Sequence, residues 1–196
     1  MEKTFIFVDA GFLSKLSKYF GGGFYLRYDL IKFCENFCLN QNLKCEKIFY
    51  YTAPPFQSTQ STKDEQNRKN SYDSFIKKLS LNNNLVIREG RCQKLVGKDN
   101  FVKYNQKAVD ILMTIDLMSF PIKNKNIKKI ILIACDSDFA PVIDELKNMG
   151  IKIILGTYFT KKRNTNFSRS SHLMNAVSEY VRILKEDFEN CPLEIK

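Results

Sequence analysis

The sequence has a single histidine, His172, and its six cysteines include no C-x-x-C pair. A zinc site of cysteines and histidines therefore lacks the usual ligands, and a disulfide framework is not expected in so large a core. No serine or cysteine elbow accompanies the histidine, which argues against a catalytic triad. The glycines of "FGGGF" (20–24) lack the Lys-Ser/Thr of a phosphate loop, and no dinucleotide-binding glycine fingerprint follows the first apolar run.

Long apolar runs are also absent. No stretch reaches the length of a membrane-spanning helix, and the start "MEKTFIFVDAG" turns polar too early for a signal peptide. We therefore expect a cytoplasmic protein with reduced cysteines and no membrane partner. Hydrophobic residues make up 44% of the 196 residues, which predicts one folded domain over 1–196 rather than disorder.

Acidic residues are in the minority. The chain carries 31 Lys and Arg against 21 Asp and Glu, a formal net charge of +10. A polyanion such as nucleic acid suits this charge as a partner, although a merely basic protein would have the same composition.

Short apolar runs alternate with segments of helical spacing along the whole chain. Strands are predicted at 4–9, 45–52, 84–92, 128–136 and 151–159, and helices at 12–19, 28–40, 63–81, 106–120 and 139–150, with a helix or a helix–strand pair at 170–184. The stretch "KLVGKDNFVKY" indicates a hairpin or loop around Gly97, and Pro121 is expected to end the helix before it. The alternation predicts an α/β fold with a mainly parallel central sheet and helices on both faces.

Two of the predicted strand ends carry acids. Asp9 follows "FIFV", and Asp136 follows "IILIAC" with Asp138 two residues later. The functional crevice of a parallel sheet lies beyond the carboxyl ends of its strands. Carboxylates that meet there repel one another unless a hard cation such as Mg²⁺ neutralises them. Taken singly, however, Asp138 could cap the helix at 139–150, and Asp9 could close a turn.

The helix predicted at 106–120 adds a third acid. Asp110 lies among apolar residues in "AVDILMTIDLM", where a charge needs a partner. Lys107, three residues earlier, could form a weak surface ion pair with it. Asp116 lies about 240° further around the helix, so it cannot share a narrow face with Asp110.

Three segments, in this order, resemble the NYN domain family, including its LabA-like branch. They are "FIFVDAGFL", "QKAVDILMTIDLM" and "IILIACDSDFAPVIDELKNMGIKIIL", and the tail "SSHLMNAVSEYVRI" is similar to the family's closing segment. NYN domains are PIN-like nucleases. The resemblance, which spans nearly the whole chain, therefore implies a single Rossmann-like (PIN-like) domain, a divalent metal ion, and RNA cleavage or processing.

The resemblance also implies an acidic cluster and a basic rim. The catalytic residues, and the ligands for Mg²⁺ or Mn²⁺, would be Asp9, Asp110, Asp136 and Asp138. The cationic residues that would follow the RNA backbone are Lys107 at the rim, Arg88, Arg91, Lys161, Lys162, Arg163 and Arg169. Phe167 could stack on a base, or its loop could be a solvated surface segment. The resemblance does not exclude DNA, and a homodimer is a candidate assembly.

Two positions depart from the family pattern. Phe12 stands where many members have asparagine, and Ser178 replaces the acid of the closing segment. The alternative to a nuclease is therefore an RNA-binding or regulatory module with the same fold and weak or no turnover. A phosphatase or Toprim-like enzyme fits less well, because the first strand ends in one aspartate followed by Ala10 and Gly11.

Overall fold

The computed structural model describes residues 1–97, 101–160, 167 and 170–193, and these residues form a six-stranded parallel sheet. The strand order is β3-β2-β1-β6-β7-β8, so the sheet grows in opposite directions from its centre, between β1 and β6. The strands are β1 (Glu2–Asp9), β2 (Leu43–Thr52), β3 (Leu85–Glu89), β6 (Lys129–Ile133), β7 (Lys152–Thr157) and β8 (Glu179–Arg182). The predicted α/β fold is confirmed.

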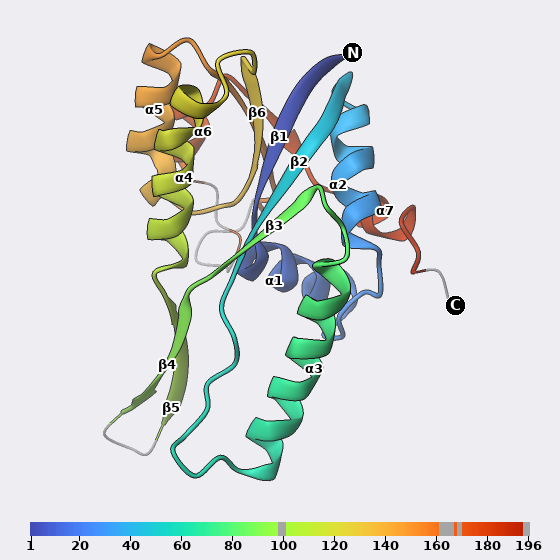
Figure 1. The fold of residues 1–196 in the computed structure, drawn as a ribbon, viewed down its shortest axis with the longest axis vertical. Helices are drawn as coiled ribbons and strands as arrows, with labels where there is room; N and C mark the ends of the chain where they lie inside the picture. Colours follow the sequence, from blue (N-terminus) through green and yellow to red (C-terminus); the bar gives the residue numbers. More distant parts are fainter. Residues whose placement is uncertain (98–100, 161–166, 168–169, 194–196) are drawn as a thin grey trace.

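Helices cover both faces of this sheet (Figure 1). One face packs against α1 (Ala10–Phe20), α2 (Leu30–Leu39) and α7 (Lys185–Glu189), the other against α4 (Val109–Lys123), α5 (Ala140–Asn148) and α6 (Ser171–Ala176). In β6 every side chain from Ile130 to Ile133 is buried, as expected for a strand covered on both sides. No helix among the described residues combines the length and apolar character needed to cross a bilayer.

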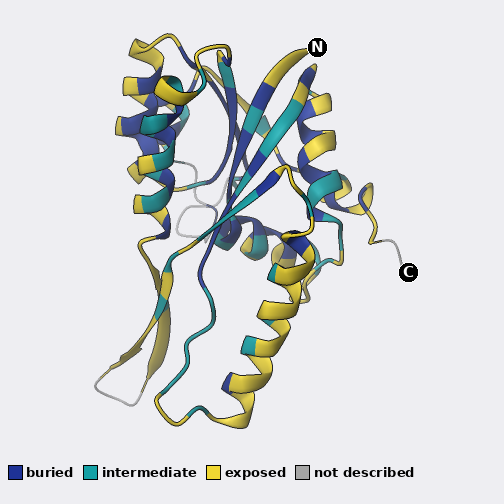
Figure 2. Cartoon of the chain, in the orientation of Figure 1, coloured by how far each residue is buried: buried dark blue, intermediate teal, exposed yellow. Residues whose placement is uncertain are grey.

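Two further elements extend beyond the sheet at one end of the molecule. They are α3 (Lys63–Leu79) and the antiparallel hairpin of β4 (Arg91–Val96) and β5 (Val102–Lys107). Both are mostly exposed (Figure 2), and α3 buries only Glu65 and Leu79. A capping box begins α3: Thr62 Oγ1 accepts from the N–H of Glu65, whose carboxylate accepts from the N–H of Thr62. The hairpin confirms the excursion predicted around Gly97.

The strand predicted at 84–92 is split in two. Strand β3 ends at Glu89, and Arg91 already belongs to the hairpin. Gly90 stands between them, where an added Cβ would lie 2.3 Å from the carbonyl oxygen of Lys107. The base of the hairpin therefore closes against a residue that has no side chain.

Both ends of α4 differ from the prediction of a helix over 106–120. The helix begins at Val109, because the residues before it belong to β5. Pro121 lies inside the helix, which continues to Lys123. Proline has no backbone N–H and therefore removes one hydrogen bond of the helix. Because Pro121 lies two residues before the last residue of α4, this loss does not prevent the last turn from forming. The tail is the helix–strand pair, α6 and β8.

Ala108, which joins the hairpin to α4, has a left-handed backbone with φ 67° and ψ −1°. This conformation costs an L-residue roughly 1–2 kcal/mol, whereas glycine adopts it readily. We expect Ala108→Gly to raise the free energy of unfolding by about 0.5–1 kcal/mol. Glycine relieves the strain in the folded state, but it also gives the unfolded chain more conformational entropy, which offsets part of the gain. Urea unfolding would measure it.

The matched control is Ala140→Gly, the same change at a buried, right-handed helical position. There glycine should lower the free energy of unfolding by about 1 kcal/mol. A loss of stability in both variants would contradict the assignment of strain to Ala108.

Candidate active site

The acids at 9 and 136 follow the two central strands of the sheet. Asp9 is the last residue of β1, and Asp136 comes three residues after the end of β6. The two strands are parallel neighbours, with Val8 paired to Ile133. Both acids therefore lie at the carboxyl edge, at the point where the strand order reverses and where ligands bind in open α/β sheets.

Asp9 is half-buried and caps α1. Its Oδ1 accepts from the backbone N–H of Gly11 at 2.8 Å and of Phe12 at 3.2 Å. Burial raises the pKa of Asp9 to about 6, and the charge of Asp110 adds to the rise, although the two N–H groups and Lys15 oppose it. Asp9 therefore does close the turn between β1 and α1, as considered from the sequence. Only its Oδ1 takes part in this cap.

Asp136 caps the next element, the short 3₁₀ helix η1 (Ser137–Phe139), and Asp138 does not cap α5. Oδ1 of Asp136 accepts from the backbone N–H of Asp138 at 3.0 Å. The N-cap position of α5 is occupied by Phe139, without a side-chain bond. The cap predicted for Asp138 is wrong, because η1 separates β6 from α5 and moves the helix start past it. Asp138 is exposed.

Asp110 lies in the first turn of α4 and faces the same region. Although the residue as a whole is exposed, partial burial of its carboxyl group raises its pKa, and the charges of Asp136 and Asp138 raise it further. Asp9, Asp110 and Asp136 line one cavity of about 1210 Å³. Asp138 is not part of the lining and reaches the cluster through its charge alone.

This acidic cluster fits a hard divalent cation by the chemistry of its donors. Carboxylate oxygens are the ligands that Mg²⁺ and Mn²⁺ prefer. Burial and like charges raise the pKa values of Asp9 and Asp110 more than the nearby charge of Lys15 lowers them, so a further positive charge would stabilise the ionised cluster. Within the described part of the chain, however, no three His, Cys, Asp or Glu side chains already stand as a metal-ligand set. The carboxylates of Asp9, Asp110 and Asp136 therefore line one cavity, but their oxygens do not converge on a single position.

Two residues at the cluster have no counterpart among the residues predicted from the sequence. Lys15 of α1 lines the cavity, and its charge lowers the pKa of both Asp9 and Asp110. Gln106 of β5 reaches the cluster from the hairpin: a Cβ added to Gly11 would lie 3.1 Å from Gln106 Oε1 and 3.1 Å from Asp9 Oδ1. The polar face of α1 could have indicated Lys15, whereas no sequence signal indicated Gln106.

Arg88 lies apart from the cluster. Its Nε donates to Oδ2 of Asp116 at 2.9 Å, and the hydroxyl of Tyr51 donates to the same oxygen at 3.0 Å. Asp116 is therefore outside the acidic cluster, in agreement with the angle argument. The guanidinium of Arg88 is thus held by Asp116, and its contact with RNA stays a prediction.

The other predicted cations are divided between the hairpin and the segment after β7. Arg91 and Lys107 face each other across the hairpin base. Lys107 is thus on a strand rather than a helix, and the described residues show no ion pair between it and Asp110. The predicted cations outside the described residues are Lys161, Lys162, Arg163 and Arg169.

Phe167 belongs to the core. It is buried, with its ring 5.2 Å from that of Tyr19, 5.6 Å from Tyr158 and 6.4 Å from Phe12. The base-stacking role considered for Phe167 is wrong, because its ring is covered by these aromatic residues. The Phe12 departure from the family pattern belongs to the same cluster.

The second departure from the family pattern, Ser178, lies at the amino ends of the strands, opposite the acidic cluster. Its backbone N–H donates to the carbonyl of Ile153, near the amino end of β7. The cluster lies at the carboxyl edge, so an acid at 178 would not reach it.

The parallel α/β sheet with helices on both faces agrees with the fold that the resemblance implies. The NYN domain model matches residues 3–184, and the chain belongs to the NYN domain family, whose members are generally nucleases of the PIN-like superfamily. A crystal structure of a protein of unknown function from Vibrio parahaemolyticus has a similar fold, with a TM-score of 0.54 and 15% identity over 95% of each chain. No curated protein matches significantly.

Proposed function

We propose that this NYN domain is a metal-dependent ribonuclease that hydrolyses phosphodiester bonds at the acidic cluster. The observation that carries the proposal is the meeting of Asp9, Asp110 and Asp136 at one cavity, with raised pKa values for Asp9 and Asp110, in a member of a nuclease family. The net charge of +10 supports RNA as the substrate. A cytoplasmic location, one domain over 1–196, the LabA-like branch and a homodimer stay predictions.

The roles of the residues follow from their positions. A bound Mg²⁺ or Mn²⁺ would lower the pKa of a water ligand and neutralise charge on the phosphate. Asp9 and Asp136 keep Oδ1 on the backbone, so their Oδ2 atoms, with Asp110, would hold the ion. Asp138, which caps nothing, would orient the attacking water at a carboxylate oxygen. Lys15 would hold the scissile phosphate against the cluster.

The test is cleavage of end-labelled single-stranded and structured RNAs with Mn²⁺, comparing wild type with Asp136→Asn. Asparagine preserves the cap of η1 and removes the charge, so we expect cleavage to fall by on the order of 100-fold with an unchanged fold. Asp144→Asn, an exposed aspartate of α5, is the matched control and should cleave like wild type. Equal cleavage by Asp136→Asn would contradict the proposal.

The second candidate is an RNA-binding module without turnover. The observation that favours it is the hairpin, whose described residues carry Arg91, Lys94, Lys103 and Lys107 and no acidic residue. Binding of RNA by wild type and Asp136→Asn alike, with no cleavage by either, would support this alternative.

A further inference from the structure

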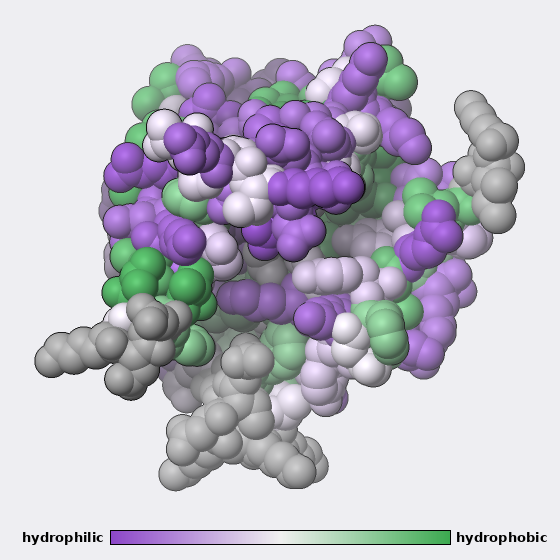
Figure 3. Space-filling view, turned by 90° about the horizontal axis from the view of Figure 1, so that it is seen from below, coloured by the Kyte–Doolittle hydropathy of each residue, from purple (hydrophilic) through white to green (hydrophobic). Residues whose placement is uncertain are grey.

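The cavity that holds the acidic cluster does not end there. It continues to the elements that extend beyond the sheet, where it is lined by Pro54 and Pro55 after β2, Arg68 of α3 and Tyr104 of β5. Figure 3 views the molecule from this end and shows a mostly hydrophilic face. A substrate at the acids would therefore pass between α3 and the hairpin.

Four side chains at this far end form a group of rings and cations, which we call the stacking platform. The ring of Phe56 lies 5.9 Å from that of Tyr104. Arg68 lies over Tyr104 at 5.6 Å and Lys94 over Phe56 at 6.0 Å. Tyr104 is 42% exposed, Arg68 and Lys94 are exposed, and Phe56 is half-buried. Tyr104 thus offers exposed ring surface to a ligand, and a base that stacks on the face covered by Arg68 would displace that side chain.

The register of the hairpin connects the platform to the acids. Lys94 pairs with Tyr104 and Cys92 with Gln106, and directly opposed residues share a face of an antiparallel ribbon. Side chains two apart along a strand also share that face. One face of the hairpin therefore runs from the platform at Tyr104 to Gln106, which lies beside Asp9.

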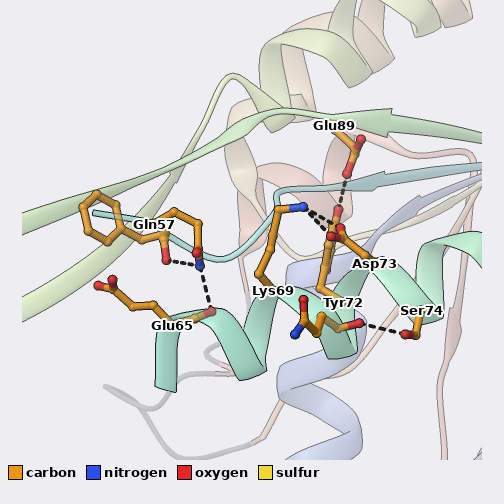
Figure 4. A network of polar contacts seen from close by, with 9 residues as sticks. Gln57, Glu65, Lys69, Tyr72, Asp73, Ser74 and Glu89 are labelled. Carbon is orange, nitrogen blue, oxygen red and sulfur yellow. Dashed lines mark hydrogen bonds and ion pairs between the residues drawn. The ribbon is translucent and has the colours of Figure 1, made fainter. Parts of the chain in front are cut away.

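Hydrogen bonds hold the loop that carries Phe56 against α3. Gln57 Nε2 donates to the carbonyls of Phe56 at 2.9 Å and Glu65 at 2.8 Å, which ties the loop to the start of the helix (Figure 4). The buried Glu65 accepts from the hydroxyl of Ser58 at 2.6 Å. Further along α3, Tyr72 donates to Glu89 at the end of β3 at 2.6 Å. The backbone that carries Phe56 and Arg68 is therefore ordered before a ligand binds, which reduces the entropy lost on binding.

We infer that the stacking platform binds an unpaired RNA strand and leads it to the acidic cluster. Bases would stack on Tyr104 and Phe56, and Arg68 and Lys94 would pair with phosphates. Exposed rings beside cations suit a strand whose bases are not paired, because a duplex hides its base faces. The inference rests on the proposed function for its substrate, and its test measures binding alone.

The test is fluorescence anisotropy of the full chain with a labelled ten-nucleotide RNA in EDTA, which prevents turnover. Tyr104→Ala should weaken binding about tenfold, since each stacked base contributes on this scale. Tyr104→Phe keeps the ring and should bind within about twofold of wild type. Arg68→Ala should weaken binding and reduce the slope of log affinity against log salt by about 0.7, one phosphate contact.

The matched control is Tyr180→Ala, an exposed tyrosine of β8 that is not part of the platform, and it should bind like wild type. Thermal melting confirms that each variant is folded. Wild-type affinity in Tyr104→Ala, or an equal loss in Tyr104→Phe, would overturn the inference, as would an equal loss for a duplex of the same sequence. Ring-dependent binding without cleavage would reject the nuclease alone, and cleavage with ring-independent binding would reject the platform alone.

Discussion

Asp9→Asn is expected to lower RNA cleavage by on the order of 1000-fold and to leave the protein folded. Asp9 is the innermost acid of the cluster, half-buried at the end of β1. Asparagine keeps an Oδ1 that accepts from the N–H groups of Gly11 and Phe12, so the cap of α1 survives while the charge is lost. Asp9→Ala would lose both, and its free energy of unfolding should lie about 1 kcal/mol below that of Asp9→Asn, the variant that lacks only the charge.

The pH dependence of stability separates this role of Asp9 from a structural one. Burial raises its pKa to about 6, above the value of about 3.9 in an unfolded chain. The folded state therefore binds the proton more tightly, and the stability that this contributes is lost as pH rises from about 4 to 6. Without divalent cations, Asp9→Asn should thus be more stable than wild type at pH 7, by at most about 3 kcal/mol, and the difference should vanish near pH 4.

Thermal melting with and without Mg²⁺ tests whether a cation binds the carboxylate of Asp9. A cation that binds the ionised carboxylate should raise the Tm of wild type at pH 7 and leave Asp9→Asn nearly unchanged. Cleavage by wild type should rise with pH as Asp9 ionises, and excess Mg²⁺ should move that rise below pH 6. An equal Mg²⁺ shift in both proteins would contradict a cation at Asp9.

The sequence predicted the sheet well because its strands are buried on both faces. An uninterrupted apolar run such as "KIILI" indicates a strand that is buried on both faces. Acids that follow neighbouring parallel strands lie at the same edge of the sheet. The meeting of Asp9 and Asp136 follows from those two facts. The position of Asp110 does not follow from the strands alone, because it depends on how α4 packs against the sheet.

The residues that the sequence did not reveal reach the site through tertiary contacts. Gln106 arrives there because the hairpin closes against Gly90, whereas the sequence predicts the hairpin or loop only as far as Tyr104 and places Gln106 at the start of a helix. The pairing of Arg88 with Asp116 joins two elements 28 residues apart. The capping error at Asp138 has a local cause, because one 3₁₀ turn before α5 shifted the cap by two residues to Asp136. Periodicity does not resolve a shift of that size.

Phe139→Ala is expected to have the largest effect on stability and to weaken the site as well. Phe139 is fully buried in the core between the sheet and α5, and it ends the turn that begins at Asp136. Removing its ring leaves a cavity and should lower the free energy of unfolding by about 3–5 kcal/mol. The turn then loses its anchor, so the carboxylates of Asp136 and Asp138 are no longer held toward the cluster.

Urea unfolding measures the first effect, and cleavage at a temperature where the variants remain folded measures the second. The matched control is Phe188→Ala, an equally buried phenylalanine on α7 in the core of the opposite face. Both variants should lose similar stability, and only Phe139→Ala should lose cleavage beyond its unfolded fraction. Phe139→Leu refills much of the space and should recover most of both properties. Equal cleavage by the two alanine variants would show that the turn does not depend on this ring, because Phe188 reaches the acids only through the stability of the whole fold.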